Sequence, residues 1–325
     1  LEYTVKLLDG SFSLILLTNQ GDIYFYRSGN KPLVFGTLDT MGTKVFVVAS
    51  ESCAITSLGG NIIRDVNPGE IMHVHQDHIF HSEKQLDVKS HHCIFEYVYF
   101  SRADSTIDGK NVHQTRIRMG ERLSEEYPVV SDNAVVVPVP DSGRSGAMGF
   151  ARASGYPYEE GLMKNRYVFR SFIEPSQAER MQLVSMKLNP VQEVIEGKEV
   201  ILVDDSIVRG TTMNRIIQLV RSRGASKVHV RSSSPPIAYP CFYGVDFPSH
   251  EELIFGSKIH TGQSYDEMVE AVRKEIGADT LGYLSIDGLI DAIGLDRKDL
   301  CLACLNGDYW YTHRETETYL NNGRI

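Results

Sequence analysis

The chain has 325 residues, of which 42% are hydrophobic and 23% are charged, as is typical of a soluble globular protein with room for two domains. No apolar run approaches the about 18 residues of a membrane-spanning helix. The formal net charge of −9 argues against a nucleic-acid partner. Five cysteines without a signal-peptide pattern indicate a cytoplasmic protein that uses them for metal binding or chemistry rather than for disulfides.

Residues 1 to about 90 are predicted to be rich in β-structure. The apolar runs SFSLILLT, DIYFYR, KVFVVAS and GEIMHVH read as strands, and turn sequences such as Asn67-Pro68-Gly69 separate them. The opening residues LEYTVKLLDG have the pattern of a strand from the middle of a domain and lack an initiator Met. We therefore expect the chain to be a fragment of a longer protein.

Four histidines, His73, His75, His78 and His81, lie close together in the sequence. His73 and His75 share one face of a strand because side chains alternate along it. No cysteine or carboxylate in their vicinity completes a metal-ligand set, so ordinary exposed histidines are expected. Cys53 lies in a strand-to-helix segment and is interpreted as a buried core thiol.

A helix is predicted from Asn111 to Tyr127, followed by a buried strand from Ala134 to Val139. The segment Asp141-Ser142-Gly143-Arg144 comes next. Backbone N–H groups beside a guanidinium form a cradle for an anion, although a plain turn is the better interpretation of this motif when it is taken alone. Further on, three cations (Lys164, Arg166 and Arg170) fall within seven residues. They form either a phosphate-binding loop or a solvated basic loop.

The most informative stretch runs from Glu199 to Gly224. Its apolar run Val200–Val203 reads as a strand buried on both faces, and it is followed by Asp204 and Asp205. A helix then ends near Gly224, at the position of a C-terminal cap. Between the acids and the helix lies a loop made of Ser206, Ile207, Val208, Arg209, Gly210, Thr211 and Thr212.

Each part of this stretch has a chemical use. Ligands of open α/β sheets bind beyond the carboxyl ends of the strands. Hydroxyl groups of Ser206, Thr211 and Thr212, with N–H groups at the helix start, can surround a phosphate. The two carboxylates can bind sugar hydroxyls or a hydrated Mg²⁺. The combination predicts a sugar-phosphate site, whereas a bare acidic pair with a glycine would be better interpreted as a cap of the next helix.

The remaining chain is predicted to contain a strand from KVHVRSSS, a Pro-rich loop with Cys241 and an amphipathic helix over Tyr265–Ile276. ADTLGYLSIDGLIDAIG is predicted to form a further helix. Cys301-Leu302-Ala303-Cys304 places two thiols on one turn, as in sites for zinc or iron–sulfur clusters and in redox pairs. Spacing alone does not show whether Cys93 and Cys241 approach this turn.

VILVDDSIVRGTT resembles the 5-phosphoribosyl-1-pyrophosphate (PRPP) motif of type I phosphoribosyltransferases, in the form seen in glutamine PRPP amidotransferases. CIFEYVYFSRADS, PDSGRSG, KNRYVFRSF and CLAC resemble further segments of that family in the expected order. The resemblance implies an α/β fold, the type I phosphoribosyltransferase fold of a parallel sheet with flanking helices, for residues 93–325. Residues 1–92 would be the C-terminal part of an αββα glutaminase domain with an N-terminal nucleophile.

The resemblance implies an amidophosphoribosyltransferase, which forms 5-phosphoribosylamine from PRPP and glutamine-derived ammonia in the first step of de novo purine synthesis. Since the resemblance does not extend to the glutaminase nucleophile, the chain as given is expected to use ammonia and not glutamine. The family also implies inhibition by purine nucleotides and a homo-oligomer, a tetramer.

The matched motifs imply roles for individual residues. Asp204, Asp205 and Arg170 would be catalytic, and Ser142 would join the two acids in holding Mg²⁺. The substrate-binding positions would be Ser142, Gly143, Arg144, Lys164, Arg166, Ser206, Ile207, Val208, Arg209, Gly210, Thr211 and Thr212. The chain departs from the family at Lys31, where Arg is usual, and at Phe169 and Ser171, which replace Gly and Thr in the closing loop and affect its hinge.

The resemblance also implies a cofactor. The segments around Cys93, Cys241, Cys301 and Cys304 match those that bind a structural [4Fe–4S] cluster in the iron–sulfur branch of the family, and zinc is the second choice. Two other classes of protein stay open, namely a salvage phosphoribosyltransferase for a free base and a non-catalytic PRPP-sensing regulator. The glutaminase-like segment and the cysteines argue against the first, and the acidic charge against the second.

Overall fold

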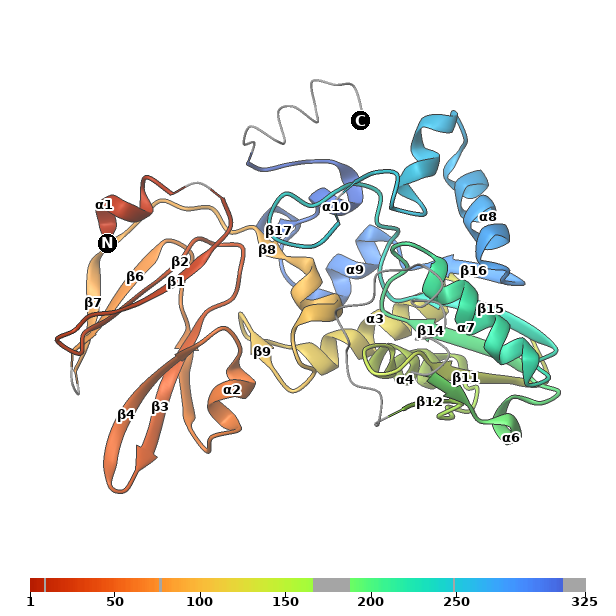
Figure 1. Ribbon diagram of the computed structural model, residues 1–325, viewed down its shortest axis with the longest axis horizontal. Coiled ribbons are helices and arrows are strands. Elements are labelled where there is room, and N and C mark those ends of the chain that lie inside the picture. Colours follow the sequence, from red (N-terminus) through yellow and green to blue (C-terminus); the bar gives the residue numbers. More distant parts are fainter. Residues whose placement is uncertain (9, 76–77, 166–187, 248, 312–325) are drawn as a thin grey trace, which may run out of the picture. The chain divides into compact units, whose positions relative to one another are not determined.

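The computed structural model describes residues 1–8, 10–75, 78–165, 188–247 and 249–311 (Figure 1). The chain divides into two compact units. Unit 1 comprises Leu1–His113, Cys241–Asp246 and the residues from Gly294 on. Unit 2 comprises Gln114–Pro240 and Phe247–Ile293. The domain boundary expected at residue 93 rests on motifs rather than on packing, and it stays a prediction.

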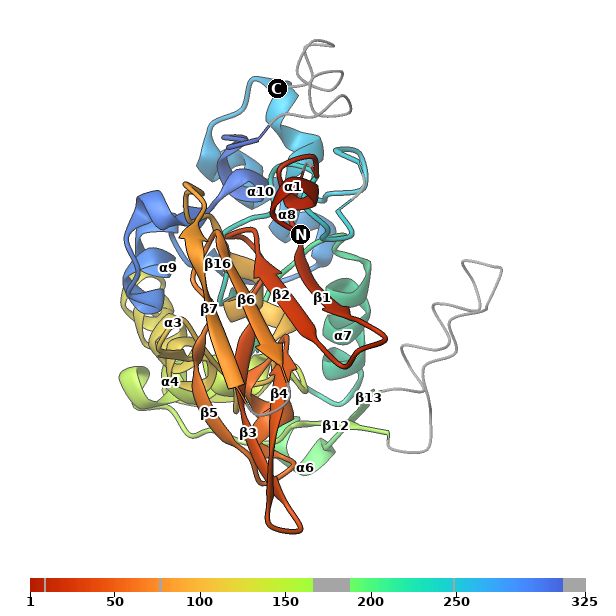
Figure 2. The same ribbon diagram turned by 90° about the vertical axis from the view of Figure 1, so that its left-hand side faces the viewer.

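Unit 1 contains two antiparallel sheets, one in the order β1-β2-β6-β7 and one in the order β4-β3-β5 (Figure 2). Phe25 and Met72 of the first sheet share an apolar core with Phe35 of the second, so the sheets pack face to face. The strands are β1 (Ser13–Leu17), β2 (Ile23–Arg27), β3 (Val34–Thr40), β4 (Thr43–Ala49), β5 (Asn61–Asp65), β6 (Glu70–His75) and β7 (His78–Gln85).

The four predicted strands of this region are confirmed as β1, β2, β4 and β6. The prediction of a strand at the start of the chain is wrong. Those residues form the one-turn helix α1 (Glu2–Val5), because Val5 packs on Tyr26 and Ile71 of the first sheet. Cys53 lies in the short helix α2 (Ser52–Thr56) and is 4% exposed, which confirms a buried thiol.

Unit 1 also contains short elements outside the two sheets. β8 and β17 form a parallel pair, and β9 and β10 form a small antiparallel pair. The elements are β8 (His92–Cys93), a π-helix (Glu96–Phe100), β9 (Thr106–Ile107), β10 (Lys110–Asn111), a 3₁₀ helix (Arg297–Asp299), β17 (Leu300–Cys301) and α10 (Ala303–Asn306).

A buried ion pair lies in unit 1. Arg27 is 1% exposed, and its guanidinium donates to Asp108 Oδ1 at 2.6 Å and to Oδ2 at 2.8 Å. It also donates to the carbonyl oxygens of Lys31 and Val66, and His92 Nδ1 lies 3.0 Å from Asp108 Oδ2. Burial opposes ionisation of Asp108, but the hydrogen bonds from Arg27 and His92 outweigh it and hold the pKa of the carboxyl well below its usual range.

We expect Asp108→Asn to lower the free energy of unfolding by about 3–5 kcal/mol at pH 7, because the change leaves a buried guanidinium without its counter-charge. Asn tolerates the left-handed backbone of this position, where φ is 49°. Since the pKa of Asp108 is lower in the folded chain, its contribution is present above about pH 4 and is lost as the pH falls below that value.

Urea unfolding at several pH values tests this expectation. The difference between wild type and Asp108→Asn should shrink below about pH 4. Asp104→Asn is the matched control, because its pair with Arg102 is more than half exposed and surface pairs contribute about 0–1 kcal/mol. If both variants lost the same free energy of unfolding, the buried pair would contribute no more to stability than the exposed pair.

Unit 2 is built on a parallel sheet in the order β11-β14-β15-β16. One face, which includes Val137, Leu202 and Val230, packs with apolar residues of α7 and α8, and α4 packs on β11 and β14. The elements are α3 (Val112–Glu126), β11 (Ala134–Pro138), α4 (Gly143–Ser154), β12 (Leu162–Lys164), β13 (Leu188–Pro190), α6 (Gln192–Ile195), β14 (Glu199–Asp204), α7 (Thr211–Ser222), β15 (Lys227–Ser232), a 3₁₀ helix (Gly256–Thr261), α8 (Tyr265–Ile276), β16 (Thr280–Tyr283) and α9 (Ile286–Ile293).

The predicted parallel α/β fold is confirmed, and the predicted helices and strands up to Ile276 agree with α3, β11, β14, α7, β15 and α8 within two residues or so. The single helix predicted for ADTLGYLSIDGLIDAIG is wrong in its first half. Thr280–Tyr283 is the edge strand β16, and a helix begins only at Ile286. Gly282 faces the ring of Tyr127, which a larger residue would meet.

Helix α4 approaches its neighbours closely because glycine recurs along it. A side chain at Gly143 would meet the carbonyl oxygen of Val203 in β14, and one at Gly146 would meet Ser233. A side chain at Gly149 would meet the backbone of α3 at Ile117. The glycines therefore let the start of α4 lie against the end of β14, where the predicted site is located.

Candidate active site

The carboxyl ends of parallel strands lie at one edge of the sheet, and the predicted site residues follow two neighbouring strands there. The loop 141–144 comes after β11 and the loop 205–210 comes after β14. The end of β15 joins them, because Asp204 is the register partner of Ser232 and accepts a hydrogen bond at its carbonyl from Ser233 N–H at 2.8 Å. This edge is where open α/β sheets bind ligands.

The two acids connect both loops. Asp205 is 7% exposed, and its Oδ1 accepts a hydrogen bond from the Ser206 hydroxyl at 2.6 Å. The Ser142 side chain also hydrogen-bonds to Asp205, so the predicted third Mg²⁺ ligand lies beside the acidic pair. Asp204 is half-buried, and its Oδ1 accepts the N–H of Asp205 at 2.9 Å.

Burial and the closeness of the carboxylates make the acidic pair unfavourable as two free negative charges. Burial raises the pKa of Asp204, and the charge of Asp205 raises it further. Burial also raises the pKa of Asp205, although hydrogen bonds from Ser142 and Ser206 and the positive charge of Arg116 oppose this. A cation bound between the acids would offset both causes.

The loop after the acids leads into the N-terminus of α7. Gly210 is the N-cap with φ 74°, and a side chain there would meet Ile254. Thr211 and Thr212 are exposed in the first turn, where the first N–H groups of a helix have no partner within the helix. Exposed hydroxyls beside such N–H groups form a suitable site for a phosphate.

The side chains of this loop differ in how far they are available to a ligand. Ile207 is 3% exposed and belongs to the apolar core of unit 2, so only its backbone can contact a substrate. The carbonyl of Val208 accepts the N–H of Ile254 at 2.9 Å. Arg209 is exposed and forms an ion pair with Glu252 at 2.6 Å.

The cationic side chains that are predicted to bind pyrophosphate form ion pairs with carboxylates. Arg144 donates to Asp141 at 2.9 Å and to Glu160 at 3.1 Å, and Tyr158 donates to the same Glu160 at 2.7 Å. Lys164, the last residue of β12, is hydrogen-bonded to Asp141. Asp141, Arg144 and Lys164 are all about half exposed, so an incoming anion can displace Asp141 while Glu160 keeps Arg144 in place. Arg166 and Arg170, together with Phe169 and Ser171, lie outside the described residues.

The four predicted cluster ligands come together within unit 1. Cys93 and Cys301 are register partners in the parallel pair β8–β17. The thiol of Cys304 interacts electrostatically with those of Cys93, Cys241 and Cys301. Burial raises the pKa of Cys93 to about 12 and also raises that of Cys301 and Cys304. All five cysteines lie in described residues, and none of them forms a disulfide.

In the described part of the chain, no three of the thiol sulfur atoms lie within 4.8 Å of one another. Among the described residues, one set of three ligating side chains has its ligand atoms within 4.8 Å of one another, and it contains no cysteine. Zinc with Zn–S bonds of about 2.3 Å would bring its sulfur ligands to roughly 3.8 Å from one another. Binding of zinc by three or four of these thiols would therefore require them to move closer together.

Comparison with known proteins agrees with this geometry. Residues 113–232 match the model of the phosphoribosyl transferase domain family. The amidophosphoribosyltransferase of Methanothermobacter thermautotrophicus is 46% identical over 94% of this chain and 63% of its own length. That of Bacillus subtilis is 46% identical over 94% of this chain and 62% of its own length. This chain thus spans less than two thirds of either relative.

A solved structure of the B. subtilis glutamine PRPP amidotransferase, in complex with ADP and GMP, superimposes with a TM-score of 0.84. It is 44% identical in sequence and covers 97% of this chain and 67% of its own chain. The chain belongs to the amidophosphoribosyltransferase family. Among the described residues, no helix of this family member combines the length and the apolar character needed to cross a bilayer.

The structure of this member of the amidophosphoribosyltransferase family shows site residues that the sequence alone did not predict. Glu160 and Tyr158 position Arg144 from a loop that carries no motif. Arg116 of α3 is 5% exposed and acts on Asp205 through its charge. An arginine on the buried face of a predicted helix could have indicated Arg116 as a site residue. Glu160 could be identified only from its contacts in the structure.

We expect Gly143→Ala to destabilise the protein by about 1–3 kcal/mol, as overpacking commonly does. The added Cβ would lie 2.5 Å from the carbonyl oxygen of Val203, which belongs to the backbone next to Asp204. Turnover should therefore fall as well. Urea unfolding and an activity assay measure both effects. Arg152→Ala, at the exposed end of the same helix, is the control and should stay within about 0.5 kcal/mol of wild type. Normal stability and turnover in Gly143→Ala would contradict this account of the close contact.

Proposed function

We propose that the chain catalyses the phosphoribosyl transfer of its family: ammonia displaces pyrophosphate from C1 of PRPP, with inversion, and 5-phosphoribosylamine forms. The observation that carries the proposal is the contact between the two loops through Ser142, Asp205 and Ser206. It brings together an anion cradle after β11, a carboxylate pair, and a phosphate site at the start of α7. PRPP has a diphosphate, ribose hydroxyls and a 5′-phosphate to match these three parts.

The 5′-phosphate binds to the loop from Ser206 to Thr212. Backbone N–H groups and the hydroxyls of Thr211 and Thr212 supply its hydrogen bonds, and the helix dipole of α7 favours its charge. Ile207 takes part through its backbone only, because its side chain is in the core. Asp204 and Asp205 accept hydrogen bonds from the ribose hydroxyls.

The donor set also fits Mg²⁺, which takes oxygen ligands and keeps several waters. Asp204, Asp205 and Ser142 would hold it, and a bound cation would offset the burial that raises the pKa values of the two acids. When bound, Mg²⁺ neutralises the diphosphate and makes it a better leaving group.

Positive side chains stabilise the charge that develops on the leaving pyrophosphate. Arg144 is already oriented by Glu160, and Lys164 reaches the same loop through Asp141. By family resemblance, Arg166 and Arg170 complete this set. The residues thus act by positioning and charge, because departure of pyrophosphate leaves oxocarbenium-like charge at C1.

The thiols of Cys93, Cys241, Cys301 and Cys304 hold a structural [4Fe–4S] cluster. Burial raises the pKa of Cys93, Cys301 and Cys304 and favours the neutral thiols, so as ligands they would become thiolates only beside the positive charge of a bound metal group. Lys31, which stands where the family usually has Arg, lowers the pKa of Cys93 and forms an ion pair with Glu96 at 3.3 Å. A lysine therefore offsets part of the negative charge around the cluster.

We also propose that this chain shares the family's inhibition by purine nucleotides and its assembly into oligomers. The B. subtilis structure contains ADP and GMP, and purine nucleotides carry a ribose phosphate that fits the same loops. We expect them to compete with PRPP, and we expect a cytoplasmic homo-oligomer, a tetramer by resemblance. Sedimentation of the purified chain measures its oligomeric state.

The test is release of pyrophosphate from PRPP by the purified chain in the presence of Mg²⁺. Ammonium should support release, and removal of Mg²⁺ should abolish it. A panel of free purine and pyrimidine bases replaces ammonium in parallel reactions. Turnover with a free base but not with ammonium would identify a salvage enzyme instead. Binding of PRPP without turnover under any of these conditions would indicate a regulator.

A further inference from the structure

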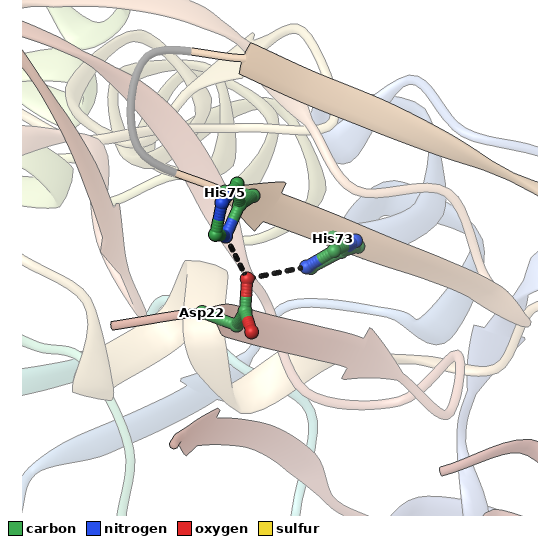
Figure 3. Close-up of side chains that lie close together, drawn as sticks. All are labelled: Asp22, His73 and His75. Atoms are coloured by element: carbon green, nitrogen blue, oxygen red, sulfur yellow. Dashed lines mark hydrogen bonds and ion pairs between the residues drawn. The ribbon is translucent and has the colours of Figure 1, made fainter. Parts of the chain in front are cut away.

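Two histidines of β6 face a carboxylate from the turn before the neighbouring strand β2. His73 and His75 are two residues apart, so they lie on one face of the sheet. Asp22 directly precedes β2, which pairs with β6 (Figure 3). The expectation that no carboxylate accompanies these histidines is wrong, because the partner is distant in sequence and arrives through strand pairing.

The three side chains converge on one point. Asp22 Oδ1 lies 3.1 Å from His73 Nε2 and is also hydrogen-bonded to His75 Nδ1. The three ligand atoms all lie within 4.8 Å of one another. A tetrahedral ion with metal–ligand bonds of about 2.0 Å would hold such atoms roughly 3.3 Å apart. The observed separation between Asp22 and His73 is already close to that value.

Neighbouring contacts keep two of these groups in position. The ring of Tyr24 stacks on His73 with a centroid distance of 4.2 Å and an interplanar angle of 4°. Asp22 is held in the β1–β2 turn, where its N–H donates to Thr18 Oγ1 at 3.1 Å and its carbonyl accepts Thr18 N–H at 2.9 Å. Preorganised ligands lose less conformational freedom when an ion binds.

We propose that Asp22, His73 and His75 bind a divalent transition-metal ion such as Zn²⁺ at the paired ends of β2 and β6. Two imidazoles and one carboxylate suit zinc and its neighbours in the first row, whereas Mg²⁺ and Ca²⁺ prefer oxygen ligands alone. Asp22 is 13% exposed, His73 28% and His75 42%, so the site is open to solvent on the His75 side. Water would complete the coordination there.

Such an ion would connect the β1–β2 turn to β6. Its role is therefore to stabilise the first sheet of unit 1, independently of the phosphoribosyl chemistry and of the cysteine set. His78 is the register partner of His75 across the β6–β7 pair, but the proposal needs only the three residues above.

The test uses the full chain, purified with its iron complement, and Zn²⁺ alone as the probe in isothermal titration calorimetry. Wild type should bind one Zn²⁺. Asp22→Asn and His75→Gln should each bind Zn²⁺ at least about 100-fold more weakly. Losing a group that only hydrogen-bonds to a ligand costs about 10–100-fold in metal affinity, and losing the ligand itself should cost more. Asp39→Asn and His113→Gln are the matched controls and should bind like wild type.

Two further measurements separate this site from the cysteines and from a folding defect. X-ray absorption at the zinc edge should show nitrogen and oxygen ligands near about 2.0 Å and no sulfur near about 2.3 Å. Added Zn²⁺ should raise the unfolding temperature of wild type and of the controls but not of Asp22→Asn. Sulfur ligation, equal affinity in all variants, or no Zn²⁺ uptake by wild type would overturn the proposal.

Discussion

Asp204→Asn and Asp205→Asn should each lower the rate of PRPP-dependent pyrophosphate release at least about tenfold while the protein stays folded. Each change removes a charge that the ribose and Mg²⁺ need. Loss of a desolvated, charged hydrogen-bond partner typically costs roughly 2–5 kcal/mol, and about 1.4 kcal/mol corresponds to a factor of ten in rate.

The fold should tolerate these changes for a physical reason. Asp205 is buried although it follows the end of a strand. Burial nevertheless raises the pKa of both acids, which means that the folded chain without a cation disfavours their charges. Asparagine has the same shape, keeps an oxygen acceptor and carries no charge. The unfolding midpoint in the absence of Mg²⁺ should therefore stay the same or rise.

Steady-state rates with ammonium and thermal unfolding curves test both halves of this prediction. Asp132→Asn is the control, because this exposed acid precedes β11 at the opposite edge of the sheet. Its rate and stability should match those of wild type. Near-normal turnover of both strand-end variants, or their unfolding, would mean that the two acids have a structural role only.

Cys301→Ser should lose the cluster and with it much of the folded protein. Cys301 is 8% exposed, pairs with Cys93 across β8–β17, and packs with Tyr243 in the cluster region. A serine hydroxyl is a poor ligand for iron. Without the cluster, the three remaining buried cysteines would lose the metal bonds that hold their segments together. Wild type purified without oxygen should be brown, with broad absorbance near about 400 nm.

Iron content, colour and folded yield are the measurements for this variant. Cys53→Ser is the matched control, since Cys53 is equally buried but lies in α2, apart from the four thiols. It should keep both iron and colour. A colourless wild type that is folded and active, with stoichiometric zinc and no iron, would eliminate the cluster.

Local sequence pattern predicted most of unit 2 because its elements are long and strongly patterned. Val200–Val203 is a continuous apolar run bounded by charged residues on both sides, which favours a buried strand, and the apolar residues of α7 recur at helical spacing. Thr280–Tyr283 was missed because a short apolar run reads equally well as strand or helix. In unit 1, Gly36 interrupts the pattern of β3, since a backbone approaches it too closely for any side chain.

The candidate site was predictable as a set of loops but not as a set of contacts. Strand order brings the loops 141–144 and 205–210 together, and each has its own motif. The restraint of Arg144 by Glu160, and the partnership of Asp22 with His73, join residues that are far apart in sequence. Such pairs depend on register and side-chain direction, which no local pattern contains.

Unit 1 is made of segments that lie far apart in the sequence, and this affects the order in which the chain can fold. Its first 113 residues are completed by Cys241–Asp246 and by the residues from Gly294 on, which are synthesised after all of unit 2. On the ribosome, this unit must wait for nearly the whole chain before its last segments can dock. Contacts between such distant segments close slowly and leave apolar surface open in the meantime. Pulse proteolysis of ribosome-bound chains of increasing length should show protection of residues 1–113 only after Cys304 has left the exit tunnel.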